Sequence, residues 1–288
     1  MAAVSYGNSA GVRRSVTPWA AVTSSVRRLE RPSRNEFLDD IVPRQQPVVI
    51  TGGMRDWSDV PLWSVERFAE GHGSRAVDTQ LRWGPQYGQV CHETMQLDRF
   101  IELMRRGEAQ GKRGIMLARP FSDFPELESR MRSPEYLPDG RRTNQFLFLT
   151  PAGFVSALHY DVCHNLLALF CGRKRVLLVP PRYAGQLYHP PLWKRHFWSS
   201  PVDAEHPDLE RYPAFAHVPR YECVLEATEM LFIPGGWRHH VRGLEESIAV
   251  AFFWEHSLEH WVRVRALGLL RGQGKLGIGE RLSRMLVR

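Results

Sequence analysis

His159 and Asp161 are separated by a single residue, Tyr160. On a β-strand, side chains at positions i and i+2 point to the same face, so an imidazole nitrogen and a carboxylate oxygen would lie close together. His239, about eighty residues later, would complete a set of two His and one carboxylate. Three such ligands leave coordination positions open on a metal ion, an arrangement that suits non-haem Fe(II). The spacing therefore predicts a catalytic iron site.

An apolar β-hairpin follows this pair. Residues 165–170 form one apolar run, Cys171 and Gly172 form the turn, and residues 173–179 form the second run. Lys174 lies just inside the returning strand, where a lone ammonium is costly unless it meets an anion. Only four of the 38 Lys and Arg residues are Lys, so a Lys here indicates a need for a compact point charge. A dicarboxylate co-substrate would supply the anion.

The order and spacing of these residues resemble the H-x-D…N…K…H pattern of the JmjC/cupin-like Fe(II)/2-oxoglutarate-dependent oxygenases. The residues that match the pattern are His159, Asp161, Asn165, Lys174 and His239. The resemblance extends through the segments H-Y-D-V-C-H-N-L-L, G-R-K-R-V-L-L-V-P-P-R-Y-A and L-F-I-P-G-G-W. It is strongest to the tRNA-modifying branch of the family, which hydroxylates a wybutosine-type base beside the anticodon.

The resemblance implies a role for each of the three metal-binding side chains. It makes His159, Asp161 and His239 the Fe(II) ligands, with no catalytic side chain beyond the metal centre. His239 is implied rather than His240 because the family's ligand lies six positions after the Ile of an Ile-Pro pair, here Ile233. The co-substrate would be 2-oxoglutarate, which is decarboxylated to succinate as the substrate is oxidised.

The resemblance also assigns residues to 2-oxoglutarate. Lys174 would pair with its distal carboxylate, and Asn165 would hydrogen-bond the end near the metal. Ser156 matches a hydroxyl position that some relatives use for the same carboxylate, although an ordinary strand serine is the alternative. Two positions depart from the family: Met116 stands where relatives often carry Tyr, and Phe252 where some carry Asn. Each loss would weaken co-substrate binding by ~0.5–1.5 kcal/mol without abolishing it.

Many short strands with Gly/Pro turns predict a mainly β fold with flanking helices. The resemblance implies a double-stranded β-helix, or jelly-roll, core. Residues 1–25 contain no acidic residue and no hydrophobic periodicity, which predicts a disordered N-terminal extension. Residues 26–256 would form the JmjC/cupin-like domain and residues 257–288 a C-terminal helical segment. Such helices often dimerise in related enzymes, so we expect either a homodimer or a cap on the barrel.

Residues 180–222 are rich in Pro, Tyr, Trp and His and are typical of a surface insertion between core strands. Within them, residues 194–198 read K-R-H-F-W. Basic residues mixed with aromatic ones can follow a phosphate backbone and stack on bases. Alternatively, the aromatic side chains pack the insertion onto the barrel. The sequence leaves both interpretations open.

The net charge of +7 favours an acidic partner such as tRNA, although an Arg-rich genome would raise the charge everywhere. No apolar run approaches the ~20 residues needed to cross a bilayer, so no membrane partner is expected. The four cysteines show no CxxC pairing, which fits the reducing cytoplasm or nucleus. The Arg- and Ser-rich N-terminus also resembles a mitochondrial transit peptide.

Three functions are compatible with these features. The first is hydroxylation of a modified tRNA base. The second is a JmjC protein hydroxylase or histone lysine demethylase with the same metal site and a protein substrate. The third is a catalytically weak cupin-fold binding protein, for which Met116 and Phe252 are the argument.

Overall fold

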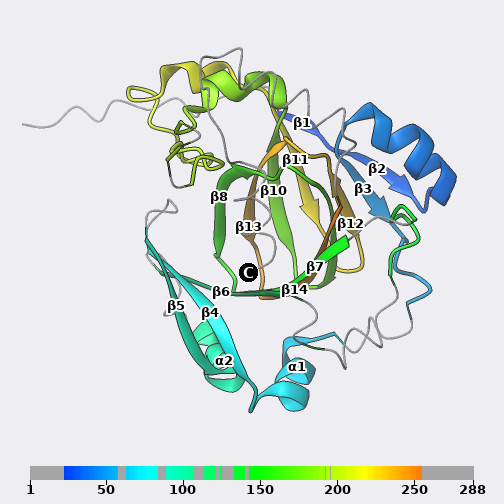
Figure 1. Cartoon of the computed structure of the whole chain (residues 1–288), viewed down its shortest axis with the longest axis vertical. Coiled ribbons are helices and arrows are strands. Elements are labelled where there is room, and N and C mark those ends of the chain that lie inside the picture. Colours follow the sequence, from blue (N-terminus) through cyan, green and yellow to red (C-terminus); the bar gives the residue numbers. More distant parts are fainter. Residues whose placement is uncertain are drawn as a thin grey trace, which may run out of the picture.

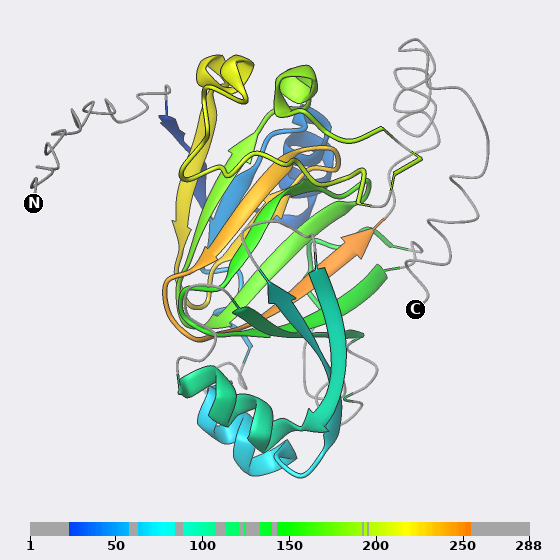
Figure 2. The same ribbon diagram turned by 90° about the vertical axis from the view of Figure 1, so that its left-hand side faces the viewer.

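Two β-sheets face each other and form the core of the protein (Figures 1 and 2). The computed structural model describes residues 23–57, 63–83, 89–106, 113–120, 124, 133–139, 143–191, 193–194 and 196–254. The predicted mainly β, jelly-roll fold with flanking helices is confirmed. The C-terminal helical segment and the dimer expected from it lie outside the described residues.

The smaller sheet has five strands in the order β1 (Thr23–Ser25), β11 (Arg220–Leu225), β10 (Lys174–Val179), β13 (Arg238–Gly243) and β8 (Val155–Tyr160). The larger sheet has nine, in the order β2 (Arg27–Glu30), β3 (Val48–Thr51), β12 (Met230–Ile233), β9 (His164–Cys171), β14 (Ser247–Trp254), β7 (Thr143–Thr150), β6 (Arg113–Pro120), β4 (Ala76–Trp83) and β5 (Gln89–Gln96). The helical segments are η1 (Glu36–Ile41), η2 (Val42–Arg44), α1 (Val65–His72), α2 (Leu97–Arg105), η5 (Pro181–Leu187) and η6 (Pro213–His217).

Strand alternation divides the apolar residues into three layers. One cluster lies between the sheets and takes side chains from both, for example Leu167 of β9 and Val176 of β10. The neighbouring residue Leu166 belongs to a second cluster, in which α1 and α2 pack on the outer face of the larger sheet. Leu177 belongs to a third, in which the insertion covers the smaller sheet. Since successive strand residues point to opposite faces, the facing of each site residue follows from its register.

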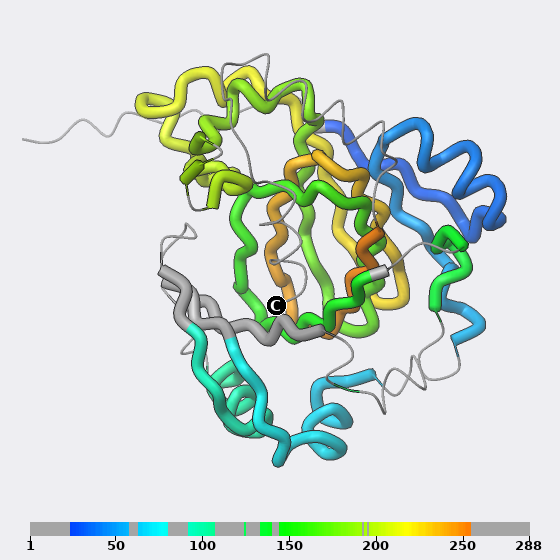
Figure 3. The backbone as a smooth tube through the Cα atoms, viewed as in Figure 1, coloured from blue at the N-terminus to red at the C-terminus, as the bar shows by residue number. Residues whose placement is uncertain are grey.

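The N-terminal chain passes from one sheet to the other. β1 pairs in parallel with β11, and β2, which follows after one residue, pairs in parallel with β3 (Figure 3, dark blue). Val26 at the crossing is buried in the cluster between the sheets. The described residues begin at Thr23, so residues 1–22 of the N-terminal extension expected from the sequence lie outside them.

Local contacts hold several of these elements in place. Four apolar residues of α2 are buried. Ser33 caps the helical segment that follows it, because its Oγ accepts a hydrogen bond from the Glu36 N–H at 3.2 Å. The hairpin turns at Gly172, whose φ is +78° and where an added Cβ would lie 2.1 Å from the Glu246 carbonyl oxygen. Only glycine fits such a turn. No helix in the described part of the chain has the length and apolar character needed to cross a membrane.

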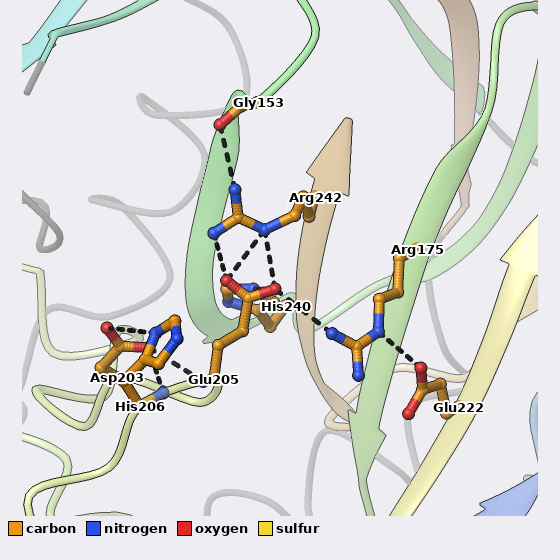
Figure 4. A network of polar contacts seen from close by, with 8 residues as sticks. All are labelled: Gly153, Arg175, Asp203, Glu205, His206, Glu222, His240 and Arg242. Carbon is orange, nitrogen blue, oxygen red and sulfur yellow. Dashed lines mark hydrogen bonds and ion pairs between the residues drawn. The ribbon is translucent and has the colours of Figure 1, made fainter. Parts of the chain in front are cut away.

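A buried carboxylate clamps the insertion onto the smaller sheet (Figure 4). Both carboxylate oxygens of Glu205 accept hydrogen bonds from Arg242 Nε, at 2.7 and 2.9 Å. His240 Nε2 and an Arg175 guanidinium nitrogen each lie 3.6 Å from Glu205 Oε1. Burial alone would raise the pKa of Glu205, but the hydrogen bonds and charges of Arg242 and His240 hold it below its ordinary value. Glu205 is therefore ionised at neutral pH and fixes the insertion at this point.

Candidate metal centre

His159 and His239 lie directly opposite each other on the neighbouring antiparallel strands β8 and β13. Their ring centroids are 4.1 Å apart. Asp161, just past the end of β8, places its Oδ2 3.6 Å from His239 Nε2. One ligand atom from each of the three side chains lies within 4.8 Å of the others. The structure thus brings together the three residues predicted as metal ligands.

Hydrogen bonds to the backbone orient both imidazole rings. His159 Nδ1 lies 2.7 Å from the Ala157 carbonyl oxygen, and His239 Nδ1 lies 3.2 Å from that of Trp237. A carbonyl only accepts, so Nδ1 of each ring carries the proton and the lone pair is on Nε2. Backbone partners of this kind are usual for metal-binding His. Both rings are therefore held in the tautomer that a metal at Nε2 requires.

The Asp161 carboxylate is the third donor. Its side chain is 34% exposed, and its backbone carbonyl accepts a hydrogen bond from the Gly236 N–H at 2.7 Å. That bond ties the loop after β8 to the residues that precede β13. Partial burial raises the pKa of Asp161, and the neighbouring His239 opposes the rise. A bound cation would favour the ionised carboxylate more strongly, because it adds positive charge at the oxygen atoms.

A β-bulge sets the position of Ser156. Ser156 pairs with Val241 and His159 with His239, so two residues of β8 stand opposite His240 alone. Residues three apart on a regular strand point to opposite faces, but the extra residue in a bulge restores the same facing. Ser156 therefore shares the inner face with His159. Sequence spacing alone could not show this, because the bulge is defined by pairing with a strand some eighty residues away.

Lys174 is buried, 4% exposed, on the same face of β10 as Val176 and Leu178, which point between the sheets. Its Nζ donates a hydrogen bond of 2.7 Å to Thr150 Oγ1, which is 2.9 Å from Ser247 Oγ. Among the residues that the structure describes, no carboxylate forms an ion pair with Lys174. Burial lowers the pKa of Lys174 to about 8. An ammonium with only hydroxyl partners inside a barrel is a site for an anionic ligand.

Asn165 occupies the same interior. It is 5% exposed and pairs with Ile233 and Phe253, whose side chains border the cluster between the sheets. Its Oδ1 is buried, and the described part of the chain offers it no hydrogen-bond partner. Such an atom costs free energy in the empty protein, on the order of 1–3 kcal/mol. A ligand that hydrogen-bonds this amide would recover the cost.

These groups are arranged along the barrel axis. Leu178 pairs with His239, and Lys174 lies four residues away on the same strand, roughly 13 Å at ~3.3 Å per residue. The end near Lys174 is closed by hydrogen bonds among turns, such as Gly243 N–H to the Phe154 carbonyl at 2.9 Å. The metal ligands lie at the opposite end. A short dicarboxylate between the two ends would have the metal on one side and Lys174 on the other.

The prediction that Phe252 weakens co-substrate binding is wrong. Phe252 does not replace an Asn that faces the co-substrate, because its side chain lies in the outer cluster beneath the helices. Phe253, one residue on, borders the interior instead. Met116 is on β6, where its backbone pairs with Gln80, but its side chain lies outside the described residues. Only the position of Met116 therefore remains as a departure from the family pattern.

The neighbouring histidines take structural positions. His240 pairs with Leu177 on the outer face of the smaller sheet, opposite to the face of His239. His164 packs between Phe232 and Trp254, with ring centroids 5.4 and 5.3 Å away. Its Nδ1 accepts a hydrogen bond from the Gly235 N–H at 3.3 Å. His164 therefore supports the outer core rather than facing the substrate.

The chain is similar in sequence to known proteins. The sequence pattern of the cupin-like domain family matches residues 34–260. The chain is 31% identical over 250 residues to tRNA wybutosine-synthesizing protein 5 of Gallus gallus. The aligned residues cover 79% of this chain and 76% of that protein. It is 28% identical over 253 residues to the Homo sapiens protein of the same name, and this alignment covers 80% of this chain and 78% of the human protein.

A second group of relatives carries a different name. The chain is 30% identical over 237 residues to lysine-specific demethylase 8 of Xenopus tropicalis. The aligned residues cover 80% of this chain and 53% of that protein. The match thus spans about half of the demethylase. Both groups of relatives support an oxygenase-type enzyme. The family match extends over most of the chain, and the protein therefore belongs to the cupin-like, JmjC-type domain family.

Proposed function

We propose that the protein is an Fe(II)- and 2-oxoglutarate-dependent dioxygenase that hydroxylates a modified base of tRNA. The observation that carries the proposal is the convergence of His159, Asp161 and His239 within 4.8 Å. It is joined by the buried Lys174 at the other end of the same interior, which forms no ion pair with any carboxylate that the structure describes. A metal site alone would fit many proteins. A metal site aligned with a buried cation fits one that also binds a dicarboxylate.

The donor set fits iron. Two imidazole nitrogens and one carboxylate on one side of an ion leave positions open for a chelating ligand and for dioxygen. Iron, when bound, would supply the oxidising power and the decarboxylation of 2-oxoglutarate to succinate. Calcium or magnesium sites are built from oxygen ligands instead. The residues present therefore suit Fe(II) better than an oxygen-preferring cation.

The protein's own groups would position the co-substrate and exclude water. Lys174 would pair with its distal carboxylate, and Thr150, which already contacts the ammonium, would hold that ammonium in place. Asn165 would hydrogen-bond the end near the metal. Ser156 shares the face of His159 and would offer its hydroxyl to the same ligand. The apolar cluster between the sheets keeps the remainder of the interior dry.

The tRNA substrate is supported by the charge of +7 and by the two relatives named for wybutosine synthesis. The experiment is a comparison of tRNA nucleosides from a deletion strain and its parent by mass spectrometry. The proposal predicts that one hypermodified guanosine loses one oxygen atom in the deletion strain. Re-expression of the wild-type chain should restore it, and His239→Ala should not. Identical nucleosides in both strains would refute the tRNA substrate.

A protein substrate is the second candidate, and the 30% identity to lysine-specific demethylase 8 is the observation that favours it. The same metal centre would then oxidise a side chain of a partner protein. Proteomics of the deletion strain would detect the missing oxidation. A catalytically weak binding protein is the third candidate. Phe252 no longer supports it, because this side chain faces away from the interior, and Met116 is the remaining argument. Succinate release with added Fe(II) and 2-oxoglutarate would exclude it.

A further inference from the structure

Two large hydrophobic side chains are exposed in the part of the chain that the structure describes. Trp193 is 70% exposed and Leu244 is 37% exposed. Leu244 lies in the turn after β13, at the closed end of the barrel. Trp193 lies in the insertion that covers the other end (Figure 1, yellow-green segments at the top). A mostly exposed indole is a large apolar surface, and its function depends on what lies around it.

The described residues between 193 and 198 fall into two groups, one that is packed and one that is exposed. His196, Phe197 and Trp198 pack against one another, with ring centroids 5.1 Å apart for His196–Trp198 and 5.2 Å for Phe197–Trp198. These three rings contact one another within the insertion. Trp193 and Lys194 do not belong to this group, since both are exposed. A turn formed by Lys194 N–H and the Pro191 carbonyl, 2.9 Å apart, holds them.

The same segment is attached directly to the metal-binding strand. Ser199 forms a β-bridge with His159. On either side of it, Tyr160 N–H donates to the Trp198 carbonyl at 3.1 Å, and Ser200 N–H donates to the Leu158 carbonyl at 2.8 Å. Trp193 is six residues from Ser199, so the chain between them spans at most ~20 Å. The backbone of Trp193 therefore lies within ~20 Å of Ser199, which is paired with the metal-binding strand.

The segment that carries Trp193 contains basic residues and no acidic ones, because the sequence has no acidic residue between Asp161 and Asp203. Arg182 is exposed on η5, with its guanidinium 4.9 Å from the centre of the Tyr183 ring. A partner for this surface must offer planar apolar groups next to negative charges. An unpaired nucleotide has both, as a base with a π-face and a phosphate.

We propose that Trp193 and Lys194 form an RNA-binding patch, in which the indole stacks on an unpaired nucleobase and the ammonium contacts a neighbouring phosphate. The proposal deepens the proposed function, on which it rests for the choice of RNA. It assigns to the insertion the task of holding a loop of RNA at the rim of the metal site. The bases bound here flank the nucleotide that enters the barrel.

The test measures RNA binding without turnover. The probe is a fluorescent ten-nucleotide single-stranded RNA, compared with an abasic strand and a duplex of the same length, against the full-length protein. Stacking predicts that Trp193→Ala weakens binding of the single strand roughly ten-fold, and that Trp193→Phe retains most of the affinity. The abasic strand and the duplex should bind the wild type weakly. Lys194→Ala should reduce the slope of log K against log salt by roughly 0.7.

Leu244→Ala is the matched control, because it removes the other exposed hydrophobic side chain at the opposite end of the barrel. It should bind RNA as the wild type does. The proposal is overturned if Trp193→Ala binds within two-fold of the wild type. It is also overturned if Trp193→Ala slows oxidation of a protein but leaves RNA affinity unchanged. If RNA binding depends on Trp193 but no nucleoside is oxidised, the patch stands and only the tRNA reaction fails.

Discussion

His159 and His239 form a directly opposed pair across β8 and β13, and each ring is hydrogen-bonded through Nδ1 to the carbonyl two residues before it. The identical local geometry comes from two strands that are far apart in the sequence. Because the antiparallel pairing sets the distance between the rings, the metal site depends on the register of these strands. A shift by one residue would send one imidazole to the opposite face.

The metal ligands should be dispensable for folding but not for metal binding. His159→Ala and Asp161→Ala are each expected to weaken Co(II) or Mn(II) binding by more than about 100-fold, because substitution of groups that merely support such ligands already costs 10–100-fold. Isothermal titration calorimetry on the metal-free protein measures this. The control is His217→Ala, which removes an exposed imidazole at the end of η6 that belongs to neither candidate metal-binding group of the described residues. Unchanged affinity in the ligand variants would mean that the metal binds elsewhere.

Lys174 should lower the stability of the empty protein. Burial lowers its pKa from 10.5 to about 8, so the unfolded chain binds the proton more tightly than the native one. The free energy of unfolding is therefore lowered by the full amount below pH 8, and this loss disappears as the pH rises toward 10.5. Lys174→Met is therefore expected to raise the free energy of unfolding by about 1–3 kcal/mol at pH 7. Urea denaturation measures the change, and Lys194→Met, at an exposed position, should alter stability by less than about 0.5 kcal/mol.

The same residue should control the pH dependence of co-substrate binding. A dicarboxylate binds the protonated ammonium, so the dissociation constant of 2-oxoglutarate should rise above pH 8, by roughly ten-fold per pH unit. Lys174→Met should bind 2-oxoglutarate weakly at all pH values and lose this dependence. Calorimetry on the Mn(II)-loaded protein at pH 7 and pH 9 tests both points. Equal affinity of the variant and the wild type would exclude Lys174 as the carboxylate partner.

Asn165 should matter for the ligand and little for the fold. Its Oδ1 is buried and has no hydrogen-bond partner within the described ranges, so Asn165→Leu removes an unsatisfied acceptor and is expected to keep or raise the free energy of unfolding. Affinity for 2-oxoglutarate should fall by roughly ten-fold, the equivalent of one hydrogen bond. Asn144→Ala, an exposed amide at the start of β7, is the control. A large loss of stability with normal co-substrate affinity would show that Asn165 is a structural residue.

Glu205 should stabilise the insertion. Its pKa is lowered in the folded protein. Its contribution to the free energy of unfolding is therefore complete above the ordinary pKa of a Glu and is lost as the pH falls through the lower pKa of the folded state. Glu205→Gln leaves Arg242 without its anionic partner and should cost about 2–4 kcal/mol at pH 7. Glu245→Gln, whose side chain is 50% exposed beside Arg173, should cost less than about 1 kcal/mol. Urea denaturation at pH 7 measures both, and equal effects would argue against the clamp.

The sequence predicted features that depend on local spacing. His159 and Asp161 share a face by alternation, and the apolar hairpin surrounds Lys174. What it could not predict depends on long-range pairing. The bulge that turns Ser156 inward needs β13, and the clamp by Glu205 needs an insertion folded back on the sheet. The prediction for Phe252 is wrong because the face that β14 turns outward is set by its pairing with β9: Phe252 stands beside Leu166 and lies with it in the outer cluster.

The central claim is that His159, Asp161 and His239 hold one Fe(II) that 2-oxoglutarate can reach from the side of Lys174. The most direct measurement is an anaerobic titration of the metal-free protein with Fe(II) and 2-oxoglutarate, followed by visible absorption. We expect a metal-to-ligand charge-transfer band that saturates at one iron per chain and is absent in His239→Ala. Failure of the wild-type protein to bind iron, or a band that persists in His239→Ala, would contradict the account.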